Sequence, residues 1–197
     1  MNFSAVILAG GKSSRMGRDK AWLEVEGMPL LARQVKLVRE MGAAEIFISG
    51  RPEKDYSEFG CPVLQDKFAG AGPLAGIERA LAATSSSLLL VLAVDLPAMK
   101  AGFLRRLAAT CTDHYGAIPR LAGNIEPLAA FYPKSSRLLA ESLLCGRHNA
   151  VAIFAGHCVR SGLAQFVDQS PGEAVYFSNW NSPSDLVSEA RHGQPAA

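Results

Sequence analysis

The sequence predicts an α/β fold, in which helices flank both faces of a mainly parallel sheet. Short apolar runs alternate with segments of helical periodicity, which is the pattern of β–α–β units. One run, Leu88–Val94, is apolar at every position, as expected of a strand covered on both faces. A chain of 197 residues can form one domain with a substantial core. We expect residues 1–191 to form that domain and residues 192–197 to be a disordered tail.

The first half of the chain contains the more regular alternation. Pro29 and Gly42 bound an apolar series with helical spacing, and the glycine-rich turn Gly70–Gly76 leads into a second helix. In order, we expect a strand at 3–9, a hairpin or extended segment at 21–27, a helix at 29–42, strands at 45–49 and 62–65, a helix from the turn to about 83, a strand at 88–94 and a helix at 103–109.

The second half is less regular. Two strands, 115–118 and 127–132, flank a polar turn at 122–124. We then expect helices at 135–144 and 150–155, a last short strand at 175–177 and a terminal helix at 183–190.

The composition excludes several classes of protein. With 19% charged residues and a net charge of +2, the chain lacks the dense basic stripe of a nucleic-acid-binding protein. No stretch approaches membrane-spanning length and no basic segment precedes the first apolar run, so we expect no membrane partner and a cytoplasmic location. The scattered cysteines predict neither a zinc site nor a redox motif nor a disulfide scaffold. They are Cys61, Cys111, Cys145 and Cys158.

The most informative stretch follows the first predicted strand. There Gly10 and Gly11 open a short basic loop that contains Lys12, Arg15, Arg18 and Lys20. Paired glycines let the backbone turn sharply and bring N–H groups close to an anion. Val6 stands where a P-loop needs glycine, and the spacing to Gly17 does not fit the dinucleotide fingerprint. We therefore expect a nucleotide loop at the carboxyl end of the first strand.

Two acidic residues follow other predicted strands, and ligands of open parallel sheets bind beyond that end of the strands. Asp95 leaves an apolar strand, where a carboxylate is costly unless it is solvated, paired or holding a cation. Mg²⁺ arriving with a nucleoside triphosphate would suit it, and capping the turn beside Pro97 is the alternative. Asp66 can accept hydrogen bonds from a ligand, or belong to a turn.

Three strings together resemble a known family. Leu8–Lys20 reads Leu-Ala-Gly-Gly-x-Ser-x-Arg-Met-Gly-x-Asp-Lys, which closely resembles the signature loop of the molybdenum cofactor guanylyltransferases, within the nucleotidyltransferase superfamily. Asp95-Leu96-Pro97 resembles that family's metal motif, with Asp two residues before Pro. Phe177–Leu186 is similar to the family's Phe-x-Asn-x-Asn-Thr-Pro-Glu-Asp-Leu. The resemblance implies a Rossmann-like nucleotidyltransferase domain.

The resemblance also implies roles for individual residues. Ser49 stands where the family can place Asn, and Arg147 is our choice for the acceptor's phosphate, although an ungapped register favours Asn149. The implied catalytic residues are Arg15, Lys20 and Asp95, with Asp95 as the Mg²⁺ ligand. The implied nucleotide-binding residues are Leu8, Ala9, Gly10, Gly11, Lys20, Ser49, Asp66, Gly76 and Asp95, and the implied acceptor-binding residues are Arg147, Asn179 and Asn181.

The implied reaction transfers GMP from GTP to molybdenum–molybdopterin, giving the guanine dinucleotide cofactor and pyrophosphate. Molybdoenzymes or their chaperones are candidate protein partners. Three alternatives stay open: a cytidylyltransferase that uses CTP, a sugar-phosphate nucleotidyltransferase, and a nucleotide-binding regulator without catalytic activity. Gly10, Asp19 and the Asn179–Asn181 segment favour the guanine-specific branch.

Overall fold

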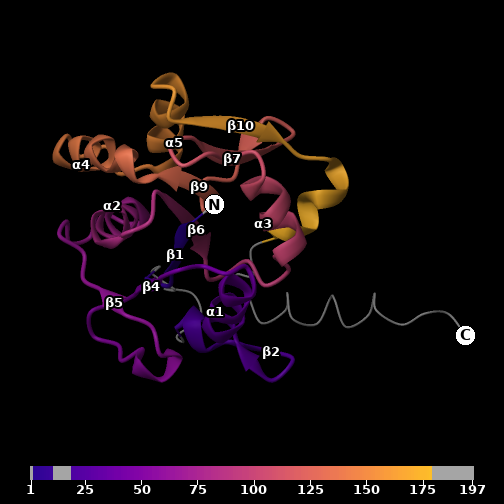
Figure 1. Ribbon diagram of the computed structural model, residues 1–197. Coiled ribbons are helices and arrows are strands. Elements are labelled where there is room, and N and C mark those ends of the chain that lie inside the picture. Colours follow the sequence, from indigo (N-terminus) through magenta and orange to yellow (C-terminus); the bar gives the residue numbers. More distant parts are fainter. Residues whose placement is uncertain (1, 11–18, 179–197) are drawn as a thin grey trace, which may run out of the picture.

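A central sheet organises the computed structural model, which describes residues 2–10 and 19–178 (Figure 1). Within these residues the strand order is β10-β7-β9-β6-β1-β4-β5, and β8 pairs with β7. The strands are β1 (Phe3–Leu8), β4 (Ile46–Ser49), β5 (Val63–Leu64), β6 (Leu88–Ala93), β7 (Gly116–Leu121), β8 (Asn124–Ile125), β9 (Ala129–Pro133) and β10 (Ala164–Asp168), and a separate hairpin joins β2 (Glu24–Val25) to β3 (Met28–Pro29).

The sheet is mainly parallel, as the sequence predicts. β1 pairs in parallel with β4 on one side and with β6 on the other, and β5 continues in parallel beyond β4. β9 is antiparallel to both β6 and β7, while β7 and β10 are parallel to each other. The carboxyl ends of β6, β1, β4 and β5 therefore lie next to one another at one edge of the sheet.

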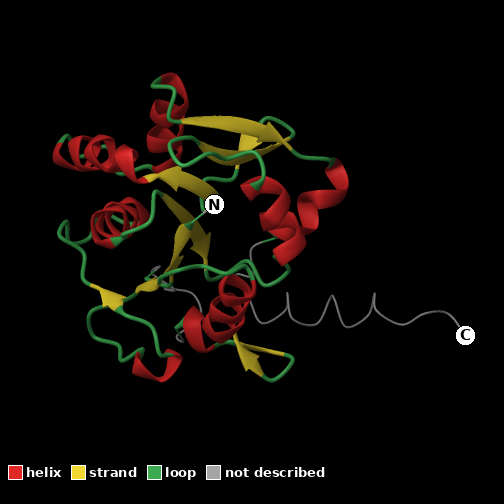
Figure 2. Ribbon diagram, in the orientation of Figure 1, coloured by secondary structure: helices red, strands yellow, loops and turns green. Residues whose placement is uncertain are grey.

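Helices cover both faces of the sheet (Figure 2). Leu88, Leu90 and Leu92 of β6 pack into one apolar cluster with residues of α1 and α3, whereas Leu89 and Val91 pack into a second cluster with α2, α4 and α5. Each fully buried Leu or Val contributes about 1.5–3 kcal/mol of transfer free energy, so β6 is a principal source of stability. The helices are α1 (Leu30–Glu40), α2 (Pro73–Ala83), α3 (Ala101–Ala108), α4 (Arg137–Cys145) and α5 (Val151–Arg160), and the short 3₁₀ helices are η1 (Lys20–Trp22), η2 (Ser57–Phe59), η3 (Lys134–Ser136) and η4 (Pro171–Phe177).

One predicted element needs correction, and one edge strand is missing from the predicted elements. The segment 175–177, predicted as a strand, belongs to the 3₁₀ helix η4, which begins with a capping box in which Ser170 and Glu173 bond each other's backbone N–H groups. The edge strand β10 was not predicted, because Gln165 and Asp168 break its apolar pattern. The predicted helix at 183–190 and the tail at 192–197 lie outside the described residues.

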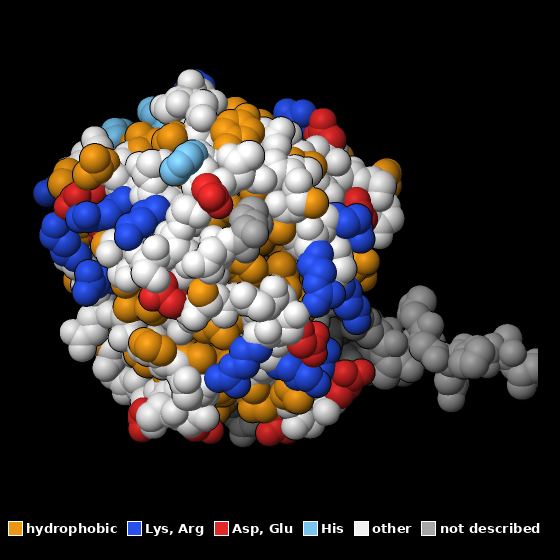
Figure 3. All heavy atoms as spheres, viewed as in Figure 1, with side chains coloured by type: hydrophobic (Ala, Val, Ile, Leu, Met, Phe, Trp, Pro, Cys, Tyr) orange, Lys and Arg blue, Asp and Glu red, His pale blue; other side chains and the backbone are white. Residues whose placement is uncertain are grey.

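The surface carries both signs of charge. On the face shown in Figure 3, Lys and Arg side chains form separate groups with Asp and Glu side chains between them. In the part of the chain that the structure describes, no helix is both long enough and apolar enough to cross a bilayer.

Candidate active site

Several of the predicted site residues lie at or just beyond the carboxyl ends of neighbouring parallel strands. Leu8 of β1 is in register with Ala93 of β6, and Val94 N–H donates to the Leu8 carbonyl over 3.1 Å. On the other side of β1, Ala9 N–H donates to the Ser49 carbonyl over 2.8 Å. Gly10 and Asp95 therefore leave adjacent strands at one edge, as the parallel-sheet rule predicts. Gly11 and Arg15, the next predicted residues of the loop, lie outside the described residues.

An ion pair joins two of the predicted catalytic residues, Lys20 and Asp95. The Lys20 ammonium lies 2.8 Å from Asp95 Oδ2, although the two residues are far apart in sequence. Their side chains are 19% and 22% exposed, so both groups reach solvent and a ligand can approach them. Pairing also satisfies the Asp95 carboxylate at the end of the buried strand β6. This geometry places a cation and an anion at the edge of the sheet where Gly10 follows β1.

Lys20 is held by the local structure that precedes it. It is the first residue of η1, and the Asp19 side chain caps that helix by accepting a hydrogen bond from Ala21 N–H over 3.1 Å. Asp is a favoured N-cap residue because its carboxylate satisfies an N–H that the helix leaves unpaired. The cap fixes the backbone at Lys20, from which the ammonium reaches Asp95.

Leu8, Ser49 and Gly76 meet where α2 packs on the sheet. All three are buried, and a Cβ at Gly76 would lie 2.2 Å from Ser49 Oγ and 3.1 Å from Leu8 Cδ2. The side chains of Leu8 and Ser49 thus point toward α2. Glycine at position 76 has a packing explanation, and the predicted contacts of these residues with the nucleotide stay predictions. Ala9 is also buried, and its N–H is bonded to the Ser49 carbonyl.

Asp66 follows β5 by two residues and is exposed. Partial desolvation and the negative charge of nearby Glu78 raise the pKa of the Asp66 carboxyl above its ordinary value. Glu78 is itself buried on α2 and is paired with Arg137 of α4 over 3.3 Å. Asp66 thus lies at the same edge of the sheet as Gly10 and Asp95, one strand beyond β4.

A groove of about 310 Å³ contains the residue predicted to bind the acceptor. Arg147 follows α4 with φ of 61°, a left-handed conformation that is costly for a residue other than glycine. Asn149, the alternative from the ungapped register, lines the same groove. The complete lining is Phe68, Ala69, Gly70, Ala71, Leu144, Arg147 and Asn149. The groove thus joins both candidates to the glycine-rich turn, while Asn179 and Asn181 lie outside the described residues.

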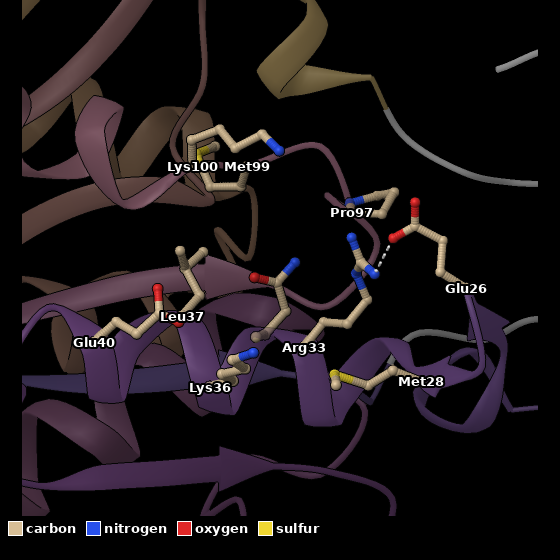
Figure 4. Close-up of a pocket in the computed structure, with 10 residues that line it drawn as sticks. Glu26, Met28, Arg33, Lys36, Leu37, Glu40, Pro97, Met99 and Lys100 are labelled. Carbon is tan, nitrogen blue, oxygen red and sulfur yellow. Dashed lines mark hydrogen bonds and ion pairs between the residues drawn. The ribbon is translucent and has the colours of Figure 1, made fainter. Parts of the chain in front are cut away.

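A second groove has a volume of about 430 Å³ (Figure 4). It lies between α1 and the segment that follows Asp95, and Pro97, Met99 and Lys100 form one wall. Gln34, which sequence reasoning missed, is buried in this region and donates from Nε2 to the Leu96 carbonyl over 2.8 Å. This bond fixes the backbone directly after Asp95. A single polar residue in an apolar helical pattern gives no signal of such a role.

The donor set suits a metal that is bound mostly through substrate. Among the described residues, no cluster of three or more His, Cys, Asp or Glu side chains could hold a metal by itself. Asp95 offers one partly exposed carboxylate at the sheet edge. Mg²⁺ is commonly bound by one or two carboxylates together with substrate phosphates and water. The arrangement around Asp95 therefore fits Mg²⁺ that arrives with a nucleotide.

Comparisons with known proteins identify the family of the chain. Residues 5–166 match the family model described as the MobA-like NTP transferase domain. A probable molybdenum cofactor guanylyltransferase of Opitutus terrae is 39% identical over 191 residues, which cover 95% of each chain.

Two solved structures share the fold. Molybdopterin-guanine dinucleotide biosynthesis protein A of Archaeoglobus fulgidus has a TM-score of 0.73 at 22% identity, covering 97% of this chain and 100% of the other. The 2-C-methyl-D-erythritol 4-phosphate cytidylyltransferase of Thermus thermophilus has a TM-score of 0.72 at 21% identity, with the same coverage of 97% and 100%. Because guanine-linked and cytosine-linked proteins are equally similar in fold, the fold leaves the choice of base to the site residues.

Proposed function

The chain belongs to the MobA-like NTP transferase family, and from this membership we propose that it transfers GMP from GTP to molybdenum–molybdopterin. The products are the guanine dinucleotide form of the cofactor and pyrophosphate. The full-length relative named for this activity supports the proposal. The observation that carries it in the structure is the Lys20–Asp95 ion pair beside the end of β1.

The reaction needs placement and charge neutralisation more than proton transfer. An oxygen of the acceptor's terminal phosphate attacks the α-phosphorus of GTP, while the bond from that phosphorus to the bridging oxygen breaks and its electrons leave with pyrophosphate. Because the attacking oxygen is already anionic, no strong general base is required. Holding the two groups in line and neutralising the triphosphate supply the rate enhancement.

We assign the neutralising groups from their places at the sheet edge. The Lys20 ammonium binds the β- and γ-phosphates and stabilises the departing pyrophosphate, and Arg15 of the signature loop shares this role. Asp95 is the residue that would hold Mg²⁺, which when bound withdraws charge from the phosphate oxygens. Gly10 and Gly11 bring backbone N–H groups to the phosphates.

The remaining assignments concern the base and the acceptor. Asp66 accepts hydrogen bonds from the guanine or the ribose, and Ser49 and Gly76 shape that part of the pocket. Arg147 binds the acceptor's phosphate from its groove beside Phe68–Ala71, together with Asn179 and Asn181. The shared groove of Arg147 and Asn149 supports an acceptor site near the glycine-rich turn.

The cellular setting is also a proposal. All four cysteines are free thiols, which is the state that a reducing cytoplasm maintains. We infer a cytoplasmic location from this and from the composition. Direct docking on molybdoenzymes or their chaperones stays a prediction.

The metal assignment is tested by changing Asp95→Asn, which keeps the shape of the side chain and removes its charge. We expect pyrophosphate release to fall about a hundredfold or more, the size of effect seen when one preorganised electrostatic contact is removed. Asp168→Asn is the matched control, because Asp168, on the edge strand β10, makes a surface ion pair with Arg120 of β7. Near-normal turnover by Asp95→Asn would remove Asp95 from the mechanism.

A further inference from the structure

We propose that Tyr56 is a positioning residue of the nucleotide site, which holds Asp19 and Trp22 on either side of Lys20 and so sets the place of the Lys20 ammonium. The inference rests on the proposed function, because it assigns Lys20 to the triphosphate. Tyr56 lies in the segment between β4 and η2, far in sequence from Lys20 and outside the strings that resemble the family. It is 1% exposed and therefore cannot be a simple surface residue.

Tyr56 is fixed to the end of β4 by its ring and its hydroxyl. The ring lies so close to Gly50 that a Cβ there would be 2.2 Å from Cε2 of Tyr56. The hydroxyl accepts a hydrogen bond from Arg51 N–H over 3.0 Å. Gly50 also faces the nucleotide loop, since a Cβ at Gly10 would lie 3.5 Å from the Gly50 carbonyl oxygen. Tyr56 is thus anchored to Gly50 and Arg51, and Gly50 is the residue whose backbone lies near Gly10.

The Tyr56 side chain contacts Asp19, which precedes Lys20, and Trp22, which follows it by two residues. The Tyr56 hydroxyl donates to Asp19 Oδ2 over 3.5 Å, a long hydrogen bond, while Asp19 Oδ1 caps η1. The Trp22 ring stacks on the Tyr56 ring, with centroids 5.0 Å apart and an angle of 25° between the planes. Because Lys20 lies between Asp19 and Trp22, the position of its backbone follows that of Tyr56.

The chemistry of Asp19 explains why it needs such a partner. Its side chain is only 5% exposed, and a buried carboxylate is costly unless it is paired and hydrogen-bonded. Arg51 Nε lies 3.9 Å from Asp19 Oδ2, which supplies the opposite charge. The Tyr56 hydroxyl adds a donor, and burial raises the pKa of Tyr56, so the hydroxyl stays protonated and able to donate. Tyr56 thus links the end of β4 to the cap of η1.

The test is Tyr56→Phe, which removes the hydroxyl and keeps the ring against Gly50 and Trp22. Equilibrium binding of Mg²⁺ with GTP and with GMP is measured by calorimetry for the wild type and the variant. We expect the affinity for GTP to fall about tenfold, the scale of one hydrogen bond to a charged group. GMP lacks the β- and γ-phosphates that Lys20 binds, so its affinity should stay unchanged.

Two further variants separate positioning from stability. Tyr132→Phe removes another buried hydroxyl, which donates to the Pro127 carbonyl over 3.0 Å, and it should leave the GTP affinity unchanged. In a Lys20→Ala background, Tyr56→Phe should have no added effect on GTP binding, because residues that act through one another are not additive. Equal losses for GTP and GMP, or full additivity with Lys20→Ala, would overturn the inference.

The outcome for Tyr56 is distinguishable from failure of the proposed function. The experiment uses the nucleoside triphosphate that the wild-type chain binds best, together with the matching monophosphate. The proposed function predicts that these are GTP and GMP. If the wild type prefers CTP, the proposed function fails, and the same comparison with CTP and CMP still decides the role of Tyr56. If the wild type binds no nucleotide, both proposals are rejected.

Discussion

Gly76→Ala tests how closely α2 must approach the sheet beneath the site. The new Cβ would lie 2.2 Å from Ser49 Oγ, 2.9 Å from Ser49 Cβ and 3.1 Å from Leu8 Cδ2. Rotating the Ser49 side chain would move Oγ away but would leave its Cβ within the overlap. The helix itself must therefore shift away from β1 and β4, where it lies over the ends of both strands.

The expected cost follows from two opposing terms. Overpacking a closed core costs about 1–3 kcal/mol, and an overlap of this depth belongs in the upper part of that range. Alanine is favoured over glycine within a helix by up to about 1 kcal/mol, which offsets part of the cost. We expect Gly76→Ala to lower the free energy of unfolding by about 1–2 kcal/mol.

Urea unfolding measures this difference, and the chain offers a matched control. Gly102 lies in α3, and a Cβ there would meet no atom within 4 Å, so Gly102→Ala should be neutral or slightly stabilising. Ser49→Gly removes both overlapping atoms of Ser49, so Gly76→Ala should cost less stability in a Ser49→Gly background than in the wild type. If Gly76→Ala is as stable as Gly102→Ala, the packing argument is wrong.

Three other properties can be checked directly. Ser4 donates a hydrogen bond to the Glu45 carboxylate over 2.6 Å and is the main cause of the lowered pKa of Glu45, so Ser4→Ala should destabilise the fold most at pH values above the ordinary glutamate pKa. The loss of stability should shrink as acid protonates Glu45, which unfolding curves from pH 7 to 3 measure, and a loss independent of pH would refute this reasoning. Iodoacetamide at pH 8 should modify the exposed Cys145 and spare Cys158, because burial raises the pKa of the Cys158 thiol to about 12. Mass spectrometry of the labelled native protein measures both reactions, and equal labelling of the two cysteines would contradict the burial of Cys158. In steady-state kinetics, Arg147→Ala should raise the KM for the acceptor about tenfold and leave the KM for GTP unchanged. A raised KM for GTP with an unchanged KM for the acceptor would assign Arg147 to the nucleotide instead.

The main features of the fold could be predicted because local pattern and tertiary structure agree. Leu88–Val94 is apolar throughout and forms the central strand β6, so the acidic residue after it had to emerge at the carboxyl edge. The parallel arrangement then placed Gly10 and Asp95 on adjacent strands. The predicted turn at 122–124 is also present, but it joins β7 to the short β8. The partner that follows, β9, instead inserts antiparallel between β6 and β7.

Other features depend on contacts that no local pattern reveals. Tyr56 bonds Asp19 across 37 positions of sequence, and Gln34 bonds Leu96 across 62 positions. Both are single polar groups in otherwise ordinary segments, so only the folded chain shows what they hold. Gly76 was predicted from its place in a glycine-rich string, whereas its space requirement comes from Ser49, on a strand far away in sequence. Sequence patterns therefore identify the edge of the sheet where the proposed site lies more readily than the residues that would position it.

We propose above that this chain joins a guanine nucleotide to the molybdenum cofactor. The most direct measurement incubates the full chain with purified molybdenum–molybdopterin, Mg²⁺ and each of the four ribonucleoside triphosphates in turn, and determines the product masses. We predict that, of the four triphosphates, only GTP gives a product, that this product is heavier than the acceptor by one GMP unit, and that one pyrophosphate is released for each product formed. A product formed with CTP but not with GTP, or no nucleotide product at all, would rule out this function.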